Sequence, residues 1–143
     1  MARTRGRRLP WVAGLALVVV VVLGAGAFGG YRLWYEQAPP PAPGGPGVVR
    51  LTNPNSGGVP PPEYRVRLTD DQSVLLALAF IDGSGASATA HLSIVLGPAP
   101  SHIVALRRGQ ATSVPGATIR VLDIYQEPDS KKDAVDVLVT APR

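Results

Sequence analysis

The chain has 143 residues, a formal net charge of +4, a pI near 10 and no cysteine. Without cysteine it cannot form a disulfide framework, a thiolate zinc site or a lipid-modified cysteine anchor. The positive charge would suit a nucleic-acid partner, but four arginines between residues 3 and 8 supply all of the excess, and from residue 48 onward nine basic residues balance nine acidic ones. Because the rest of the chain is neutral, we do not expect nucleic-acid binding.

An uninterrupted apolar stretch, Trp11–Phe28, follows the basic tip formed by residues 1–10. Its eighteen residues, at about 1.5 Å per helical residue, are just long enough to cross roughly 30 Å of hydrocarbon. Aromatic residues flank the stretch on both sides, and such rings prefer the headgroup layer. We therefore predict a transmembrane signal-anchor helix over residues 11–35. The predicted membrane-interface residues are Arg7, Arg8, Trp11, Tyr31, Trp34 and Tyr35.

The arginines before the apolar stretch also predict its orientation. Basic residues are retained on the cytoplasmic side, so we expect a single-pass protein of the cell membrane with its C-terminal part extracytoplasmic. A second hypothesis is a cleavable signal peptide, because Ala25, Gly26 and Ala27 form an A-x-A site and cleavage after Ala27 would release a secreted binder or inhibitor. The apolar stretch continues beyond that site and the aromatic belt follows it, which favours the retained anchor.

The segment 36–62 is predicted to be a Pro/Gly-rich linker, since nine of the 15 prolines lie between residues 38 and 62. Proline-rich chains are extended by about 3.1 Å per residue, so this stretch would reach up to roughly 75 Å from the membrane. Within it, Val48–Thr52 (VVRLT) has the composition of a strand. We expect it to dock as an edge strand on the following domain.

Residues 63–143 show period-two patterns and turn residues every eight to twelve positions, as in all-β domains. Val74–Ile81 is continuously apolar, which predicts a central strand covered on both faces. Glycines within Asp82–Gly85 suit a hairpin turn, and a change of phase between Val121 and Leu122 predicts a β-bulge. The other predicted strands cover residues 64–68, 88–96, 102–106, 111–114, 117–126 and 135–139.

These strands predict an all-β fold, namely a small β-sandwich or a partly open barrel of six to seven strands. The immunoglobulin marks, a cysteine pair around a core tryptophan, are missing, so the prediction is an architecture and not that family.

The combination of basic tip, Val/Ala-rich span, proline linker and a small domain carrying the stretch Leu106–Thr140 (LRRGQATSVPGATIRVLDIYQEPDSKKDAVDVLVT) supports one comparison. In this arrangement the chain resembles small single-pass membrane-anchored proteins of unknown function from high-GC actinobacteria. The resemblance implies an envelope setting and carries no site.

One pair of acidic residues is the strongest candidate for chemistry. If the last two strands form a hairpin around residues 127–132, residue numbers that sum to 259 are opposite each other, and Asp123 then faces Asp136. Facing carboxylates can share a proton or hold a cation. The alternative is two solvated carboxylates near Arg120 or a lysine.

The other candidates are weaker. Two charge doublets, Arg107 with Arg108 and Lys131 with Lys132, would form a small anion-binding corner if their loops meet. His91 and His102 are the only histidines, and the sequence contains no nucleophile elbow, zinc helix or phosphate loop. We therefore expect no enzyme activity, no cofactor and no metal. The leading hypothesis is a membrane-tethered, non-enzymatic interaction or envelope-support module with an unknown envelope or membrane-protein partner; a small envelope hydrolase or metal-binding domain is third.

Overall fold

The computed structural model describes residues 22–34, 38–54, 60–69 and 71–141. The chain divides into two compact units, Met1–Gln37 and Ala38–Arg143. In the first unit, residues 22–34 form a helix. Within the described residues no helix is both long and apolar enough to cross a membrane. Residues 11–21 of the predicted span, and with them Trp11, lie outside the described residues, as do Arg7, Arg8 and Tyr35.

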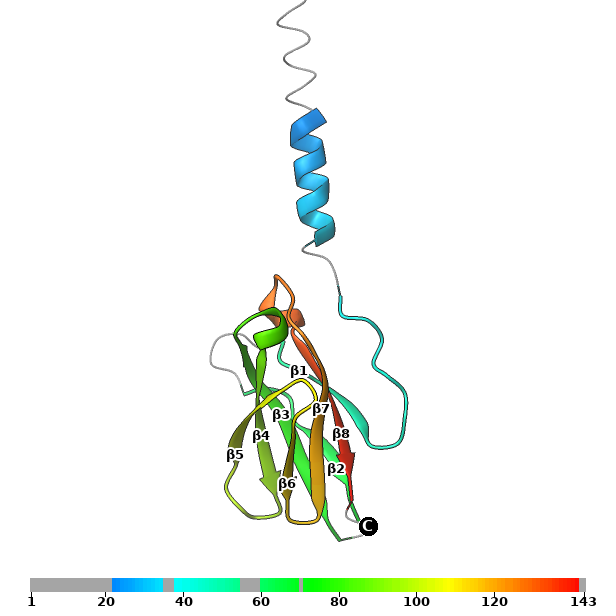
Figure 1. Ribbon diagram of the computed structural model, residues 1–143, viewed down its shortest axis with the longest axis vertical. Coiled ribbons are helices and arrows are strands. Elements are labelled where there is room, and N and C mark those ends of the chain that lie inside the picture. The colour runs from blue at the N-terminus through cyan, green and yellow to red at the C-terminus, as the bar shows by residue number, and fades with distance from the viewer. Residues whose placement is uncertain (1–21, 35–37, 55–59, 70, 142–143) are drawn as a thin grey trace, which may run out of the picture. The chain divides into compact units, whose positions relative to one another are not determined.

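The second unit consists of strands and two short 3-10 helices (Figure 1). In chain order the elements are β1 (Val48–Thr52), β2 (Tyr64–Arg67), β3 (Ser73–Asp82), η1 (Gly85–Ser87), β4 (Thr89–Leu96), β5 (His102–Arg107), β6 (Ala111–Val114), β7 (Ala117–Tyr125), η2 (Ser130–Lys132) and β8 (Ala134–Thr140). The predicted all-β class is confirmed. The strands number eight in the described residues, because Val48–Thr52 adds one to the seven that lie beyond residue 63.

The strands form two antiparallel four-stranded sheets. We call β1-β8-β7-β6 the terminal sheet, because it pairs the first strand with the last, and β2-β3-β4-β5 the meander sheet, because its strands follow one another in sequence. The inward faces of the two sheets contribute to a single hydrophobic core, which makes the arrangement sandwich-like. Its fully buried larger members are Leu51, Val74, Leu76, Leu78, Leu92, Ile94, Ile119, Val121, Val135 and Val137.

β1 is an integral strand of the terminal sheet although it arises from the Pro/Gly-rich stretch. It pairs along its whole length with β8, from Val48 opposite Leu138 to Thr52 opposite Ala134, and Leu51 is fully buried. Just before it, Gly47 has φ +77 and accepts a hydrogen bond from the Val139 amide at 2.8 Å. A Cβ at residue 47 would lie 2.3 Å from the Val139 oxygen, so this close approach requires glycine.

The connection from β1 to β2 carries the chain from one sheet to the other, and two side chains fasten it at its start. The Asn53 amide donates to the carbonyl of Ala79 at 2.7 Å. Ala79 is the extra residue of a bulge in β3, where the register shifts between Leu78 and Phe80, so Asn53 satisfies a carbonyl at this irregular position. Thr52 and Tyr64 share a hydroxyl hydrogen bond of 3.0 Å.

The two-sheet arrangement overturns one prediction. Val74–Ile81 was expected to be covered on both faces, and β3 is indeed central in its sheet, but only one of its faces packs in the core. After the bulge the alternation changes phase, and Phe80 projects away from the core with 52% of its surface exposed. The predicted bulge in β7 is confirmed, since the register with β8 shifts between Val121 and Asp123.

These positions predict unequal effects of two truncations in the same strand. Leu76→Ala removes a fully buried side chain and should lower the free energy of unfolding by roughly 2 to 5 kcal/mol through lost burial and cavity formation. Phe80→Ala should cost about 1 kcal/mol or less, since Phe80 is half exposed. Equilibrium denaturation of both variants measures the difference, and equal losses would contradict this assignment of faces.

Candidate functional site

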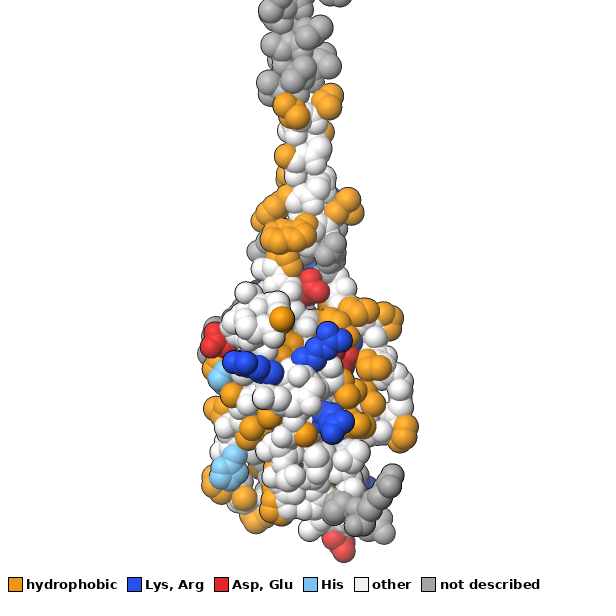
Figure 2. All heavy atoms as spheres, in the orientation of Figure 1, with side chains coloured by type: hydrophobic (Ala, Val, Ile, Leu, Met, Phe, Trp, Pro, Cys, Tyr) orange, Lys and Arg blue, Asp and Glu red, His pale blue; other side chains and the backbone are white. Residues whose placement is uncertain are grey.

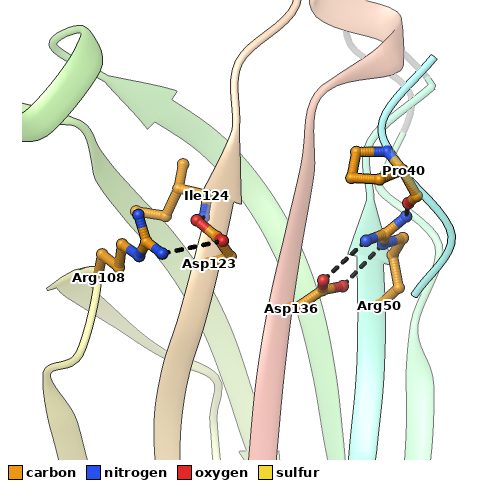
Figure 3. A network of polar contacts seen from close by, with 6 residues as sticks. All are labelled: Pro40, Arg50, Arg108, Asp123, Ile124 and Asp136. Atoms are coloured by element: carbon orange, nitrogen blue, oxygen red, sulfur yellow. Dashed lines mark hydrogen bonds and ion pairs between the residues drawn. The ribbon is translucent and has the colours of Figure 1, made fainter. Parts of the chain in front are cut away.

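Asp123 and Asp136 lie directly opposite each other on β7 and β8, so the predicted register is confirmed for the hairpin end of the two strands, residues 123–125 of β7; before the bulge the pairing differs by one position. The pairing follows from the bulge, which inserts Leu122 and moves the partner of each later β7 residue by one position. Their carboxylates nevertheless engage different cations (Figure 3). Neither cation is Arg120 or a lysine, the partners considered from the sequence.

Asp136 forms a buried bidentate ion pair with Arg50. The Arg50 Nε donates to Oδ1 and Nη2 donates to Oδ2, both at 2.7 Å. The Asp136 side chain has no exposed surface, while that of Arg50 retains 16%. Because β1 and β8 are paired at these two residues, the guanidinium reaches the carboxylate directly across the strands.

Two further contacts complete the surroundings of Arg50. Its Nη1 donates to the carbonyl oxygen of Pro40, which ties the segment before β1 to the sheet (Figure 3). Its guanidinium carbon lies 4.8 Å from the centre of the Tyr125 ring, within the range of a cation–π contact. Arg50 therefore joins three parts of the chain: the segment before β1, β8 and the end of β7.

The electrostatics of this cluster favour the ion pair. The hydrogen bond with Asp136 raises the pKa of Arg50, so the guanidinium remains charged. Desolvation raises the pKa of the Tyr125 phenol, and the charges of Asp136 and Asp123 add to this effect, while Arg50 opposes it. Tyr125 is thus held as a neutral phenol at physiological pH, because its ordinary pKa is already near 10.

Asp123 has a more exposed environment. Its Oδ2 lies 3.3 Å from the Arg108 Nη2, and its Oδ1 accepts from the amide of Ile124 at 3.0 Å. The Arg108 side chain is 71% exposed. Because each carboxylate is paired with its own arginine, the two aspartates form two ion pairs and not a shared proton site. The described residues also contain no group of three side chains that could hold a metal ion.

The two basic doublets belong to different loops. Arg107 and Arg108 lie at the end of β5 and in the turn after it, whereas Lys131 and Lys132 lie in η2 between β7 and β8. Arg108 is already paired with Asp123. The described contacts do not assemble these residues into an anion-binding corner, so that site stays a prediction.

The acidic residues around η2 serve the local fold. Asp129 caps η2 by accepting from the Lys131 amide at 3.1 Å, and Asp133 accepts from the Glu127 amide at 2.9 Å. Desolvation raises the pKa of Asp133, against the effect of that hydrogen bond.

A depression of about 300 Å³ lies between the β2–β3 and β4–β5 connections, and Asp71 is the one ionisable residue among its described lining. It offers no acid–base pair.

The outer face of the meander sheet is a candidate interaction surface. Strand pairing aligns Phe80, His91 and Ala105 in one row and Ala77, Ser93 and Ile103 in the next. The Phe80 and His91 rings are stacked, with centroids 4.0 Å apart and an interplanar angle of 17°. Ile103 is 64% exposed. We call the set Leu75, Ala77, Phe80, His91, Ser93, Val95, Ile103 and Ala105 the outer face.

Arginines border the outer face. Arg65 and Arg67 lie exposed on β2, opposite Leu75 and Ser73, and Arg107 lies exposed at the end of β5. None of the three has a salt bridge within the described part of the chain. In the view of Figure 2 the basic side chains are separated by hydrophobic and uncharged ones and form no continuous basic patch.

The ion pair of Arg50 and the exposure of Phe80 were not predicted from the sequence. Arg50 is the one charged residue in an otherwise apolar strand segment, which was a signal for a specific partner, but that partner lies 86 positions away. Phe80 stood in an apolar run whose bulge was not expected. Of the predicted interface residues, Tyr31 and Trp34 lie in the described helix and are more than half exposed. His102 is exposed at the start of β5.

Comparisons with known proteins add no assignment. No protein-family model matches the chain, and neither a curated protein nor a solved structure is significantly similar to it.

The two ion pairs predict unequal effects of the same substitution. Asp136→Asn leaves the largely buried Arg50 without its counter-charge and should lower the free energy of unfolding by about 2 to 3 kcal/mol, below the roughly 3 to 5 kcal/mol of wholly buried pairs because Arg50 still touches water. Asp123→Asn should cost about 0 to 1 kcal/mol, as for exposed pairs.

Urea unfolding measures both variants, and the double variant Arg50→Met with Asp136→Leu is the control. Because apolar residues can replace a buried ion pair with little loss, the control should be more stable than Asp136→Asn alone. Similar losses for Asp123→Asn and Asp136→Asn would contradict the difference in burial.

Proposed function

We propose that this protein is a single-pass, membrane-tethered β-sandwich that acts outside the cytoplasm as a non-enzymatic binding module for an envelope or membrane protein. The observation that carries the proposal is the exposure of Phe80 and Ile103 on the outer face of the meander sheet, which is bordered by arginines without a salt bridge in the described residues. Large apolar side chains that are exposed close together on one sheet face often mark a surface that binds a partner.

The tether is supported by sequence and by the exposed side chains of the helix. The apolar stretch Trp11–Phe28 is long enough to span a bilayer, and the basic tip favours a cytoplasmic N-terminus. Over residues 22–34 the helix leaves large apolar side chains exposed, among them Leu23 and Phe28 at 68% and 69%, and Figure 2 shows them on both sides of it. Lipid is one environment that would cover such a helix. The envelope setting also agrees with the resemblance to actinobacterial anchored proteins.

The binding partner is a protein surface with an apolar centre and carboxylates at its margin. The apolar centre would cover Phe80 and Ile103, as large aromatic and aliphatic side chains do at the core of interfaces. Carboxylates would meet Arg65 and Arg67 along one border and Arg107 at the end of β5, where Arg can form bidentate pairs.

Binding is favoured over catalysis because most of the described aspartates already have structural partners. The two facing aspartates neutralise arginines, and Asp129 and Asp133 cap backbone amides. His91 is stacked on Phe80 within the outer face. A catalyst needs a nucleophile or an acid–base pair arranged in a pocket, and the described groups support binding better.

The tether predicts behaviour in membrane extraction. The intact chain should sediment with membranes and resist alkaline extraction, while Val19→Arg with Val20→Arg should release it, since each charge at the centre of a span costs about 2.5 to 3.5 kcal/mol. Protease added outside wall-free cells should degrade the β unit. Recovery of a soluble form beginning at Phe28 would instead support signal-peptide cleavage.

The outer face predicts which position contacts the partner. A photo-crosslinking residue at position 80 in the membrane-tethered chain should yield a defined protein adduct, and Arg65→Glu with Arg67→Glu should reduce its yield tenfold or more, because like charges at an interface cost several kcal/mol. The probe at Ser113, exposed on the terminal sheet, is the positional control.

Lys131→Glu with Lys132→Glu makes the same change of charge in another loop and should leave the adduct unchanged. If the lysine variant abolished the adduct and the arginine variant did not, the binding surface would move to the η2 loop. An equal adduct from position 113 would contradict the outer face as the binding surface.

A further inference from the structure

We propose that strand β5 pairs with β5 of a second copy of this chain, in antiparallel orientation about a two-fold axis, so that two meander sheets become one eight-stranded sheet. This self-association goes beyond the proposed function, because it uses the edge of the sheet and no other protein. Free strand edges are the usual sites for such pairing.

β5 is the least protected of the four edge strands. β2 and β6 have four residues each; β2 carries Arg65 and Arg67 and follows a run of prolines, and Pro115 follows the last residue of β6. β1 has five residues and bears Arg50, which is tied to Pro40. β5 has six residues, no proline and a single arginine at its end. It also lies at the margin of the meander sheet in Figure 1.

Local hydrogen bonds identify which backbone groups of β5 point to the open edge. The Arg107 amide donates to the Gln110 side chain at 2.8 Å, and the Arg107 carbonyl accepts from the Gln110 amide at 3.0 Å. The peptide groups of Arg107 therefore face away from β4. In an antiparallel ladder this direction repeats every second residue, so the N–H and C=O groups of Ile103 and Ala105 also face the open edge. No hydrogen bond to them occurs among the described residues outside the strand ladders.

This pattern allows only registers in which edge-facing groups lie opposite one another, and one of these uses every edge-facing group of Ile103 and Ala105 without the Arg107 groups that already bond Gln110. With Ile103 opposite Ala105 of the second copy, and the reverse, both residues supply a donor and an acceptor, which gives four new backbone hydrogen bonds about an axis at Val104. A shift of one residue would place edge-facing groups opposite groups already bonded to β4. Opposite residues project to the same side of a sheet, so Ile103 and Ala105 would meet on the outer face.

The chemistry of β5 suits a second copy because the strand is complementary to itself in this register. Arg107 would lie opposite Ser101 of the second copy, so no like charges meet. The rows Phe80–His91–Ala105 and Ala77–Ser93–Ile103 would join across the axis into continuous rows over both sheets. Ile103, which is 64% exposed, would gain an apolar neighbour.

The absence of cysteine from the chain provides a direct test in the full-length, membrane-inserted protein. Val104→Cys would place two thiols at the axis, in a non-hydrogen-bonded pair whose Cα atoms are about 4.5 Å apart, within reach of a disulfide. Under mild oxidation it should form a covalent dimer at least about tenfold faster than Ser113→Cys on the edge strand β6, the matched control.

Two second-site variants keep the test decisive. Ala105→Pro removes an amide that faces the open edge and should reduce cross-linking of Val104→Cys to the control rate; Ile103→Lys, which leaves the backbone intact, should do the same if Ala105→Pro fails to fold. Cross-linking no faster than the control, or undiminished by Ile103→Lys, would overturn the proposal and indicate collision or pairing through another element. The Phe80 adduct is measured separately, so failure of self-association leaves the proposed function to its own test.

Discussion

The ion pair of Arg50 and Asp136 is the interaction on which the terminal sheet depends. A carboxylate with no exposed surface is tolerated only if its charge is neutralised and its oxygens are hydrogen-bonded, and Arg50 provides both through two contacts of 2.7 Å. Because Arg50 lies on β1, the Asp136 carboxylate is neutralised in its buried position only when β1 is paired with β8. The same arginine contacts Tyr125 and Pro40, which extends the constraint to the end of β7 and to the chain before β1.

This constraint moves the start of the folded domain forward to β1 and shortens the proposed tether. The chain between the described helix and β1 comprises residues 35–47, which would span roughly 40 Å in a polyproline conformation of about 3.1 Å per residue. The contact of Pro40 with Arg50 shortens the free part further. The tether enters the domain at the terminal sheet, whereas the proposed binding face and the proposed pairing edge belong to the meander sheet. Under the proposed function the two sheets would have separate tasks, anchoring and contact.

The sequence predicted the local features of this fold well. The positions of the strands, the alternation in β4, the bulge in β7 and the register that sets Asp123 opposite Asp136 all follow from period-two patterns and from short hairpins, which are local. The partners of the two aspartates were not predictable in this way, since Arg50 is distant in sequence and reaches Asp136 only after the first and last strands pair. Phe80 was expected in the core because the whole apolar run suggested burial on both faces. The bulge at Ala79, which Asn53 from another segment stabilises, places Phe80 on the outer face instead.

The most direct test of this account compares two fragments, residues 38–143 and residues 63–143, by equilibrium unfolding and circular dichroism. The shorter fragment lacks β1, and with it Leu51 in the core and the counter-charge of Asp136. We expect the longer fragment to unfold in one cooperative transition and the shorter one to be at least about 3 kcal/mol less stable or unfolded, given the usual costs of an emptied core position and a broken buried ion pair. Equal stability of the two fragments would contradict the claim that β1 and its arginine hold the domain together.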